Sequence, residues 1–215
     1  YAIARARADA HGVPLLLAGF SLGALMGCTL AVTRSGVQFE RMVLFAPALA
    51  LRPWSRLPRL LQRWPRAVIP SLAPQSYRAN RGTPSAAYHA LFAALADLRR
   101  GDLQLLNAPA LVWIDPQDEL VSYAGVARLV AQLPAWTLCP LRKTGRAGRE
   151  QHHLVVGDTA VGEATWNAIA ARITEFLHTA ERLPLSNRDK MYVYTATPSA
   201  SDQTVAPANP QSQIS

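Results

Sequence analysis

Five consecutive residues, 19–23 (Gly-Phe-Ser-Leu-Gly), have the types and the spacing that a nucleophilic serine needs. A serine hydroxyl is a weak nucleophile, so it must face both a base and the carbonyl that it attacks. A sharp turn from a strand into a helix would expose Ser21 in this way, and Gly19 and Gly23 would relieve the crowding on either side of it. The N–H of Leu22, at the start of the helix, would then donate to a developing oxyanion. A serine that simply caps a helix fits the same five residues, so the surrounding elements decide between the two interpretations.

The residues on either side of the turn have the character of a strand and a helix. Residues 15–19 are an apolar run typical of a strand buried on both faces, and residues 22–32 are small and apolar, which suits a closely packed helix. The other predicted strands are 41–46, 109–115 and 135–141, and the other predicted helices are 1–11, 85–99, 122–132 and 163–180. Strands that alternate with helices predict an α/β fold with a mostly parallel sheet and helices on both faces.

One predicted strand runs directly into a loop that holds three carboxylates, Asp115, Asp118 and Glu119. A base that activates a serine needs an acidic partner to fix its orientation. We choose Asp118 as that acid, because it lies past the turn and the apolar residues 120–121 could anchor the loop. Asp115 is the alternative, although it could equally cap the end of the strand. Glu119 is expected to face solvent.

Two histidines, His152 and His153, stand together between the last predicted strand and the last predicted helix. We choose His153 as the base, because the apolar residues 154–156 could hold its loop against the core. Its Nε2 would take the proton from Ser21 and later return it to the leaving group. His152 is the alternative, and the pair could also lie on the surface without a function. The remaining histidines fall in helical patterns and are interpreted as structural: His11, His89 and His178.

Four segments together resemble the successive core blocks of bacterial α/β-hydrolases: LLLAGFSLGALMG, MVLFAPAL, ALVWIDPQDELVS and HHLVVGD. The nearest types are carboxylesterases and lysophospholipase- or monoglyceride-lipase-like enzymes, and the resemblance spans about residues 10–180. It implies a serine hydrolase that needs no cofactor and cleaves acyl esters through an acyl-enzyme, on a triad of Ser21, His153 and Asp118. A thioesterase or acyltransferase with the same triad, or a catalytically silent binding protein, are the alternatives.

The chain departs from that family before the nucleophile strand. In the family, further strands come first, and one of their loops carries a second oxyanion donor, often next to a His-Gly pair. Residues 1–13 predict a helix and cannot supply this loop. We therefore expect N-terminal strands to be missing and the chain as given to be weakly active or inactive, because losing one oxyanion donor costs about 10²–10³ in rate in a known serine protease.

Two segments interrupt the alternation of strands and helices. Residues 49–100 are too long for a plain connection and predict a cap inserted into a core of residues 1–48 and 101–182. Within the cap, residues 49–70 mix leucine and tryptophan with arginine, which suits peripheral contact with a membrane or with an acyl chain, as well as ordinary packing. Residues 183–215 are rich in Ser, Thr, Pro, Asn and Gln and are predicted to be disordered.

The composition argues against several other classes. The formal net charge of +8 comes almost entirely from arginines without a nucleic-acid-binding motif, so we expect no nucleic acid as partner. Cys28 and Cys139 stand in no metal-ligand spacing, so neither a metal site nor a disulfide framework is expected. The sequence has no apolar run of roughly 18 residues and no signal-peptide pattern. The absence of a signal peptide says little about the compartment, and the location that we expect is cytoplasmic.

Overall fold

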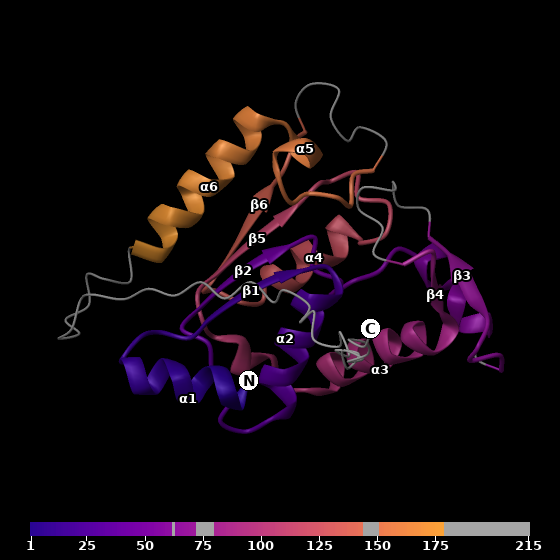
Figure 1. The fold of residues 1–215 in the computed structure, drawn as a ribbon, viewed down its shortest axis with the longest axis horizontal. Helices are drawn as coiled ribbons and strands as arrows, with labels where there is room; N and C mark the ends of the chain where they lie inside the picture. The colour runs from indigo at the N-terminus through magenta and orange to yellow at the C-terminus, as the bar shows by residue number, and fades with distance from the viewer. Residues whose placement is uncertain (62, 72–79, 144–150, 179–215) are drawn as a thin grey trace, which may run out of the picture.

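The apolar runs of the sequence form a four-stranded parallel sheet. We describe a computed structural model that covers residues 1–61, 63–71, 80–143 and 151–178. The strands are β1 (Leu16–Phe20), β2 (Arg41–Phe45), β5 (Ala110–Ile114) and β6 (Trp136–Pro140), in the order β1-β2-β5-β6 (Figure 1). Every pairing in this sheet is parallel, with Gly19 opposite Leu44 and Phe45 opposite Trp113. The carboxyl ends of parallel strands meet at one edge, where α/β folds place their sites.

Helices cover both faces of the sheet. The helices are α1 (Ala2–His11), α2 (Leu22–Thr33), α3 (Ser85–Arg100), α4 (Tyr123–Val130), α5 (Asp158–Val161) and α6 (Glu163–His178). Helices α2, α3 and α4 lie on one face and α5 and α6 on the other (Figure 1). Side chains of β2 alternate between the two cores: Met42 and Leu44 pack toward the first, and Val43 and Phe45 toward the second. The predicted α/β architecture is thus confirmed.

The long segment between β2 and β5 has two unlike parts. Its first part contains the 3₁₀ helix η1 (Trp54–Leu61) and a short antiparallel pair, β3 (Val68–Pro70) with β4 (Gly82–Pro84). The side chains of η1 include the exposed Leu57 and Leu60. Its second part is α3, which packs against α2 and buries Phe92, Leu95 and Leu98 in the main core. A second 3₁₀ helix, η3 (Leu103–Leu106), follows. The boundaries of a cap over residues 49–100 stay a prediction.

The predicted strands and the long helices lie within about two residues of their observed bounds, whereas η1, η3, β3, β4 and α5 were not predicted. The predicted tail at residues 183–215 lies outside the described part of the chain. Among the described helices, none combines the length and the apolar character that crossing a membrane requires.

Candidate active site

Ser21 stands on a strained turn between β1 and α2. Its φ of 49° and ψ of −112° lie outside the regions that side chains ordinarily allow. The backbone on both sides holds this conformation: the Ser21 N–H donates to the carbonyl of Phe45 at 2.9 Å, and the Ser21 carbonyl accepts from Leu25 at 3.2 Å and Ala48 at 3.1 Å. Strain of this kind costs about 1–3 kcal/mol and persists only where the surroundings over-determine it. The sheet and the helix therefore fix the position of the serine.

Of the two glycines that flank the serine, only Gly19 is required by crowding. A Cβ on Gly19 would stand 2.7 Å from the Cα of Ala24, in the first turn of α2. A Cβ on Gly23 would meet nothing within 4 Å outside its neighbours and its own helix. The sequence-based explanation of Gly23 is wrong, because the helix turns this position away from the strand.

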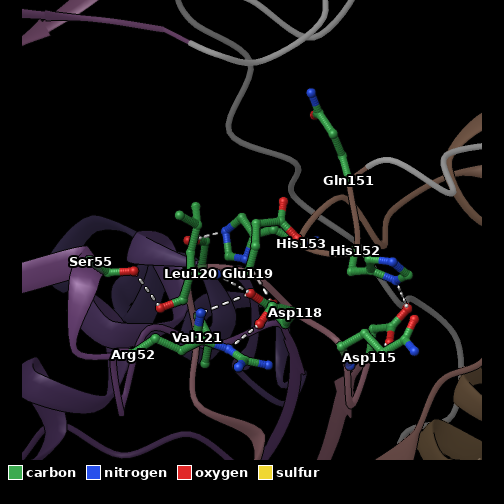
Figure 2. Close-up of polar contacts among 12 residues, drawn as sticks. Arg52, Ser55, Asp115, Asp118, Glu119, Leu120, Val121, Gln151, His152 and His153 are labelled. Carbon is green, nitrogen blue, oxygen red and sulfur yellow. Dashed lines mark hydrogen bonds and ion pairs between the residues drawn. The ribbon is translucent and has the colours of Figure 1, made fainter.

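Two hydrogen bonds join a serine, a histidine and an aspartate (Figure 2 shows the histidine above the aspartate). Nε2 of His153 lies 2.8 Å from Oγ of Ser21, and Nδ1 of His153 lies 2.9 Å from Oδ2 of Asp118. A carboxylate only accepts, so Nδ1–H donates to Asp118 and Nε2 is left to accept the hydroxyl proton of Ser21. Asp118 and His153 are both buried, at 0% and 8% exposed, so water competes little for these bonds.

The second oxygen of Asp118 is held by the backbone of its own loop. Oδ1 accepts from the N–H groups of Leu120 and Val121, both at 2.8 Å. With one oxygen on two amides and the other on His153, the carboxylate has little freedom to rotate. The Val121 side chain is fully buried, whereas Leu120 is 43% exposed, so of these two apolar residues Val121 is the one that packs into the core.

The two alternative residues of the sequence analysis pair with each other, away from Ser21. Nδ1 of His152 lies 2.9 Å from Oδ2 of Asp115, and Oδ1 of Asp115 accepts from the N–H of Gln117 at 2.8 Å (Figure 2). Asp115 is buried at 4% exposure and holds its own loop as well as the neighbouring one. The structure thus brings His153 and Asp118, but neither His152 nor Asp115, to the serine.

Glu119 does not face solvent as we expected from the sequence. Its side chain is half-buried, and Oε2 accepts the backbone N–H of His153 at 3.0 Å. The indole N–H of Trp54 donates to the Glu119 carbonyl at 2.7 Å. No local pattern predicts these contacts, because the partners are 34 and 65 residues away in the chain.

Two further features define the surroundings of the serine. Leu22 is the first residue of α2, where the N–H groups have no partner within the helix. The Phe20 ring lies 5.2 Å from the His153 ring, centroid to centroid, and covers one side of the imidazole. One backbone donor and one apolar wall therefore stand next to Ser21.

Lys143 lies close to the carboxylates of this loop. Burial lowers the pKa of Lys143, while the negative charges of Asp115, Glu119 and Asp118 act in the opposite direction. Its Nζ donates to the carbonyl of Gln151. Within the described ranges, no group of three or more His, Cys, Asp or Glu side chains could hold a metal ion.

Comparison with known proteins gives one family match and several structural ones. Residues 1–89 match the family model described as serine aminopeptidase, S33. No curated protein matches. A soluble variant of monoglyceride lipase from Saccharomyces cerevisiae, in complex with a substrate analogue, superimposes with a TM-score of 0.61 at 14% identity, over 81% of this chain and 64% of that one. The chain therefore spans less than two thirds of the yeast lipase.

Two further solved structures are similar to a comparable degree. A monoacylglycerol lipase from Paleococcus ferrophilus gives a TM-score of 0.60 at 17% identity, over 82% of this chain and 73% of that one. A structure described under the metagenome-derived lipolytic enzymes LipS and LipT gives a TM-score of 0.57 at 17% identity, over 82% of this chain and 70% of that one. At such identities the likeness shows a shared fold.

Proposed function

We propose that this chain is a serine hydrolase of the α/β-hydrolase superfamily, which cleaves carboxylic esters through an acyl-enzyme. The observation that carries the proposal is the pair of hydrogen bonds from Ser21 to His153 and from His153 to Asp118, at 2.8 and 2.9 Å. A nucleophile bonded to a base, and a base bonded to an orienting acid, is the arrangement that acyl transfer requires. The strained turn supports the same reading, because strain clusters at functional sites.

The geometry supports a reaction in two halves. Oγ of Ser21 attacks the ester carbonyl while Nε2 of His153 takes the hydroxyl proton, and the carbonyl oxygen becomes an oxyanion beside the Leu22 N–H. The tetrahedral intermediate collapses, the C–O bond to the alcohol breaks, and His153 protonates the departing alkoxide. A water molecule then attacks the acyl-enzyme and gives its proton to His153. The carboxylic acid product leaves, and His153 returns the proton to Oγ of Ser21.

The rate of this reaction depends on how many donors meet the oxyanion. Residues 2–11 form α1, as the sequence predicted, and Leu22 supplies the donor that we can name. A known serine protease slows by about 10²–10³ when one donor is removed.

The substrate class that we favour is an acyl ester with an apolar chain. Two of the similar structures are lipases of monoacylglycerols by their descriptions. The exposed face of η1 offers apolar side chains, with Leu57 62% and Leu60 75% exposed, and arginines are interspersed with them. Such a surface suits peripheral contact with a membrane that carries anionic lipid, and it would bring the site to esters held there.

The test is labelling with a fluorophosphonate probe, which reacts with activated serines, together with hydrolysis of a short-chain p-nitrophenyl ester. We expect the wild-type chain to take up the probe, and Ser21→Ala and His153→Ala to take up none. His152→Ala is the matched control, because its ring contacts Asp115 and does not reach Ser21. It should keep most of the labelling.

A folded wild-type chain that takes up no probe would contradict the proposal. Labelling that survives in Ser21→Ala would also contradict it, because the reactive serine would then lie elsewhere. Circular dichroism of every variant separates loss of the site from loss of the fold.

A further inference from the structure

Glu119 accepts hydrogen bonds through its side chain and through its backbone, from two parts of the chain that lie far apart in sequence. Its carboxylate accepts the backbone N–H of His153 at 3.0 Å, and its carbonyl accepts the indole N–H of Trp54 at 2.7 Å. Trp54 is the first residue of η1. One residue therefore bridges the start of η1 and the loop that carries the histidine.

The contact with Trp54 belongs to a set of three. Three consecutive carbonyls, those of Asp118, Glu119 and Leu120, accept from the side chains of Arg52, Trp54 and Ser55 respectively (Figure 2 shows the first and the last of these). The backbone adds to them, because the Arg52 N–H also donates to the Leu120 carbonyl at 3.0 Å. Residues 52–55 thus hold one side of the acid loop.

The carboxylates of the same loop point the other way, toward the histidines. Asp118 binds the ring of His153, Glu119 binds its backbone, and Asp115 binds the ring of His152 (Figure 2). The ring contact alone leaves the imidazole able to move with its backbone. The Glu119 contact removes that freedom, because it fixes the peptide group from which the His153 side chain starts.

The Glu119 carboxylate interacts electrostatically with Lys143. Glu119 is half-buried, and its negative charge acts on Lys143, whose pKa burial lowers. A negative charge with a nearby ammonium and an N–H to bind is stable in a partly buried site. The Glu119 carboxylate is therefore placed to accept the His153 N–H.

We propose that Glu119 is a positioning residue that holds His153 at the reacting distance from Ser21, and that Trp54 acts through it. The inference rests on the proposed function, since it assigns His153 the role of base. A displacement of about 1 Å in a catalytic group can cost about 10²-fold in rate. We expect loss of the Glu119 contact to lower the rate by a comparable factor, although Glu119 contacts neither Ser21 nor the substrate.

The test compares Glu119→Ala with Glu119→Gln, because the glutamine oxygen can still accept the His153 N–H. We expect Glu119→Ala to lower kcat, and the rate of fluorophosphonate labelling, by about 10- to 100-fold, with KM of a soluble ester changed less than about twofold. Glu119→Gln should recover most of that loss. Glu163→Ala, on the exposed start of α6, is the matched control for a lost carboxylate.

Trp54 is tested with Trp54→Phe, which keeps a ring and removes the N–H. We expect a fall of about three- to tenfold in the same rates, with Trp64→Phe, an exposed tryptophan, as the control. In the double variant Trp54→Phe/Glu119→Ala the two effects should not add, because residues that act through one contact are coupled. Full additivity would overturn the role of Trp54.

Hydrogen exchange of the His153 amide gives a readout that needs no activity. The amide should exchange slowly in the wild type and in Glu119→Gln, and at least about tenfold faster in Glu119→Ala. Equal exchange in all three overturns the positioning role, whether or not the protein hydrolyses esters. A wild type that takes no probe but shows the expected exchange pattern contradicts the proposed function alone. An active enzyme in which Glu119→Ala reacts as fast as the wild type contradicts the positioning role alone.

Discussion

The nucleophile turn and the two loops that face it are held in place by different means. The backbone holds Ser21: its N–H and its carbonyl bond to Phe45, Leu25 and Ala48, at the junction of a strand and a helix. Side chains hold the acid and the histidine. The carboxylates of residues 115, 118 and 119 bind the loop that carries His152 and His153. The side chains of residues 52–55 bind the loop that carries Asp118. The nucleophile turn depends on small residues, because they let the strand and the helix approach each other closely. The two loops depend on the presence of particular polar groups.

This difference teaches where each half of the site is vulnerable. Removing a polar side chain should leave the nucleophile turn intact and disturb the two loops. Adding a carbon atom to a small residue of the turn should disturb the turn and leave the loops intact. The variants below test the contrast, beginning with the largest expected effect.

Asp118→Asn should give the largest loss, compared with Asp115→Asn. An amide at residue 118 leaves the shape of the loop but favours the wrong tautomer of His153, and the corresponding change in a known serine protease lowers kcat by about 10⁴. Asp115→Asn disturbs the contact with His152, which does not reach Ser21, and its amide oxygen can still accept the Gln117 N–H, so it should cost less than about tenfold in kcat. The kcat of ester hydrolysis and the labelling rate measure both. Equal losses would mean that the two pairs act as one unit.

Gly19→Ala should destabilise the fold, whereas Gly23→Ala should not. The added Cβ at residue 19 would stand 2.7 Å from backbone of α2, and overpacking of this kind costs about 1–3 kcal/mol or more. At residue 23 the space is open, so the free energy of unfolding should change by less than about 1 kcal/mol. Urea unfolding measures both values. A stable and reactive Gly19→Ala would show that the turn can relax, against the contrast drawn above.

The two cysteines compare the helix behind the nucleophile turn with strand β6 of the sheet, with the smallest perturbation. Cys28 lies on α2 behind the turn, where burial raises its pKa to about 12, and Cys139 lies on β6, where burial also raises the pKa. At pH 8 a thiol of pKa about 12 is ionised to about one part in 10⁴, so a disulfide reagent should modify Cys28 far more slowly than Cys139. Comparable rates would mean that α2 opens readily.

The pH dependence of stability follows from the same burial of Cys28. Its folded pKa lies above the unfolded value, so its contribution is complete below about pH 9 and is lost as the pH rises toward about 12. The free energy of unfolding should therefore fall across that range, and less so in Cys28→Ala. Urea titrations at pH 8 and 10.5 compare the two proteins.

The sequence predicts those parts of the site that depend on local pattern. Apolar runs locate the strands, and the turn motif with its strand and helix locates Ser21. Asp118 and His153 were chosen because apolar residues follow them, and Val121 and Val155 are indeed fully buried, although Leu120 and Val156 are exposed. The bonds of Glu119 could not be foreseen, since neither periodicity nor spacing records which loops meet in space. The same is true of Gly23, whose surroundings depend on the path of the helix.

The hydrogen bond between Ser21 and His153 joins residues 132 positions apart, and this separation bears on how the chain folds. Bringing together residues so distant in sequence has a large entropic cost, and chains rich in such contacts fold slowly. The β1–α2 unit can form from neighbouring residues, but the contact with His153 needs β2, β5 and β6 to have docked first. During refolding from denaturant, the reactivity of Ser21 should therefore return after the helical signal does. The rate at which fluorophosphonate labelling recovers would therefore measure the rate of the final assembly step.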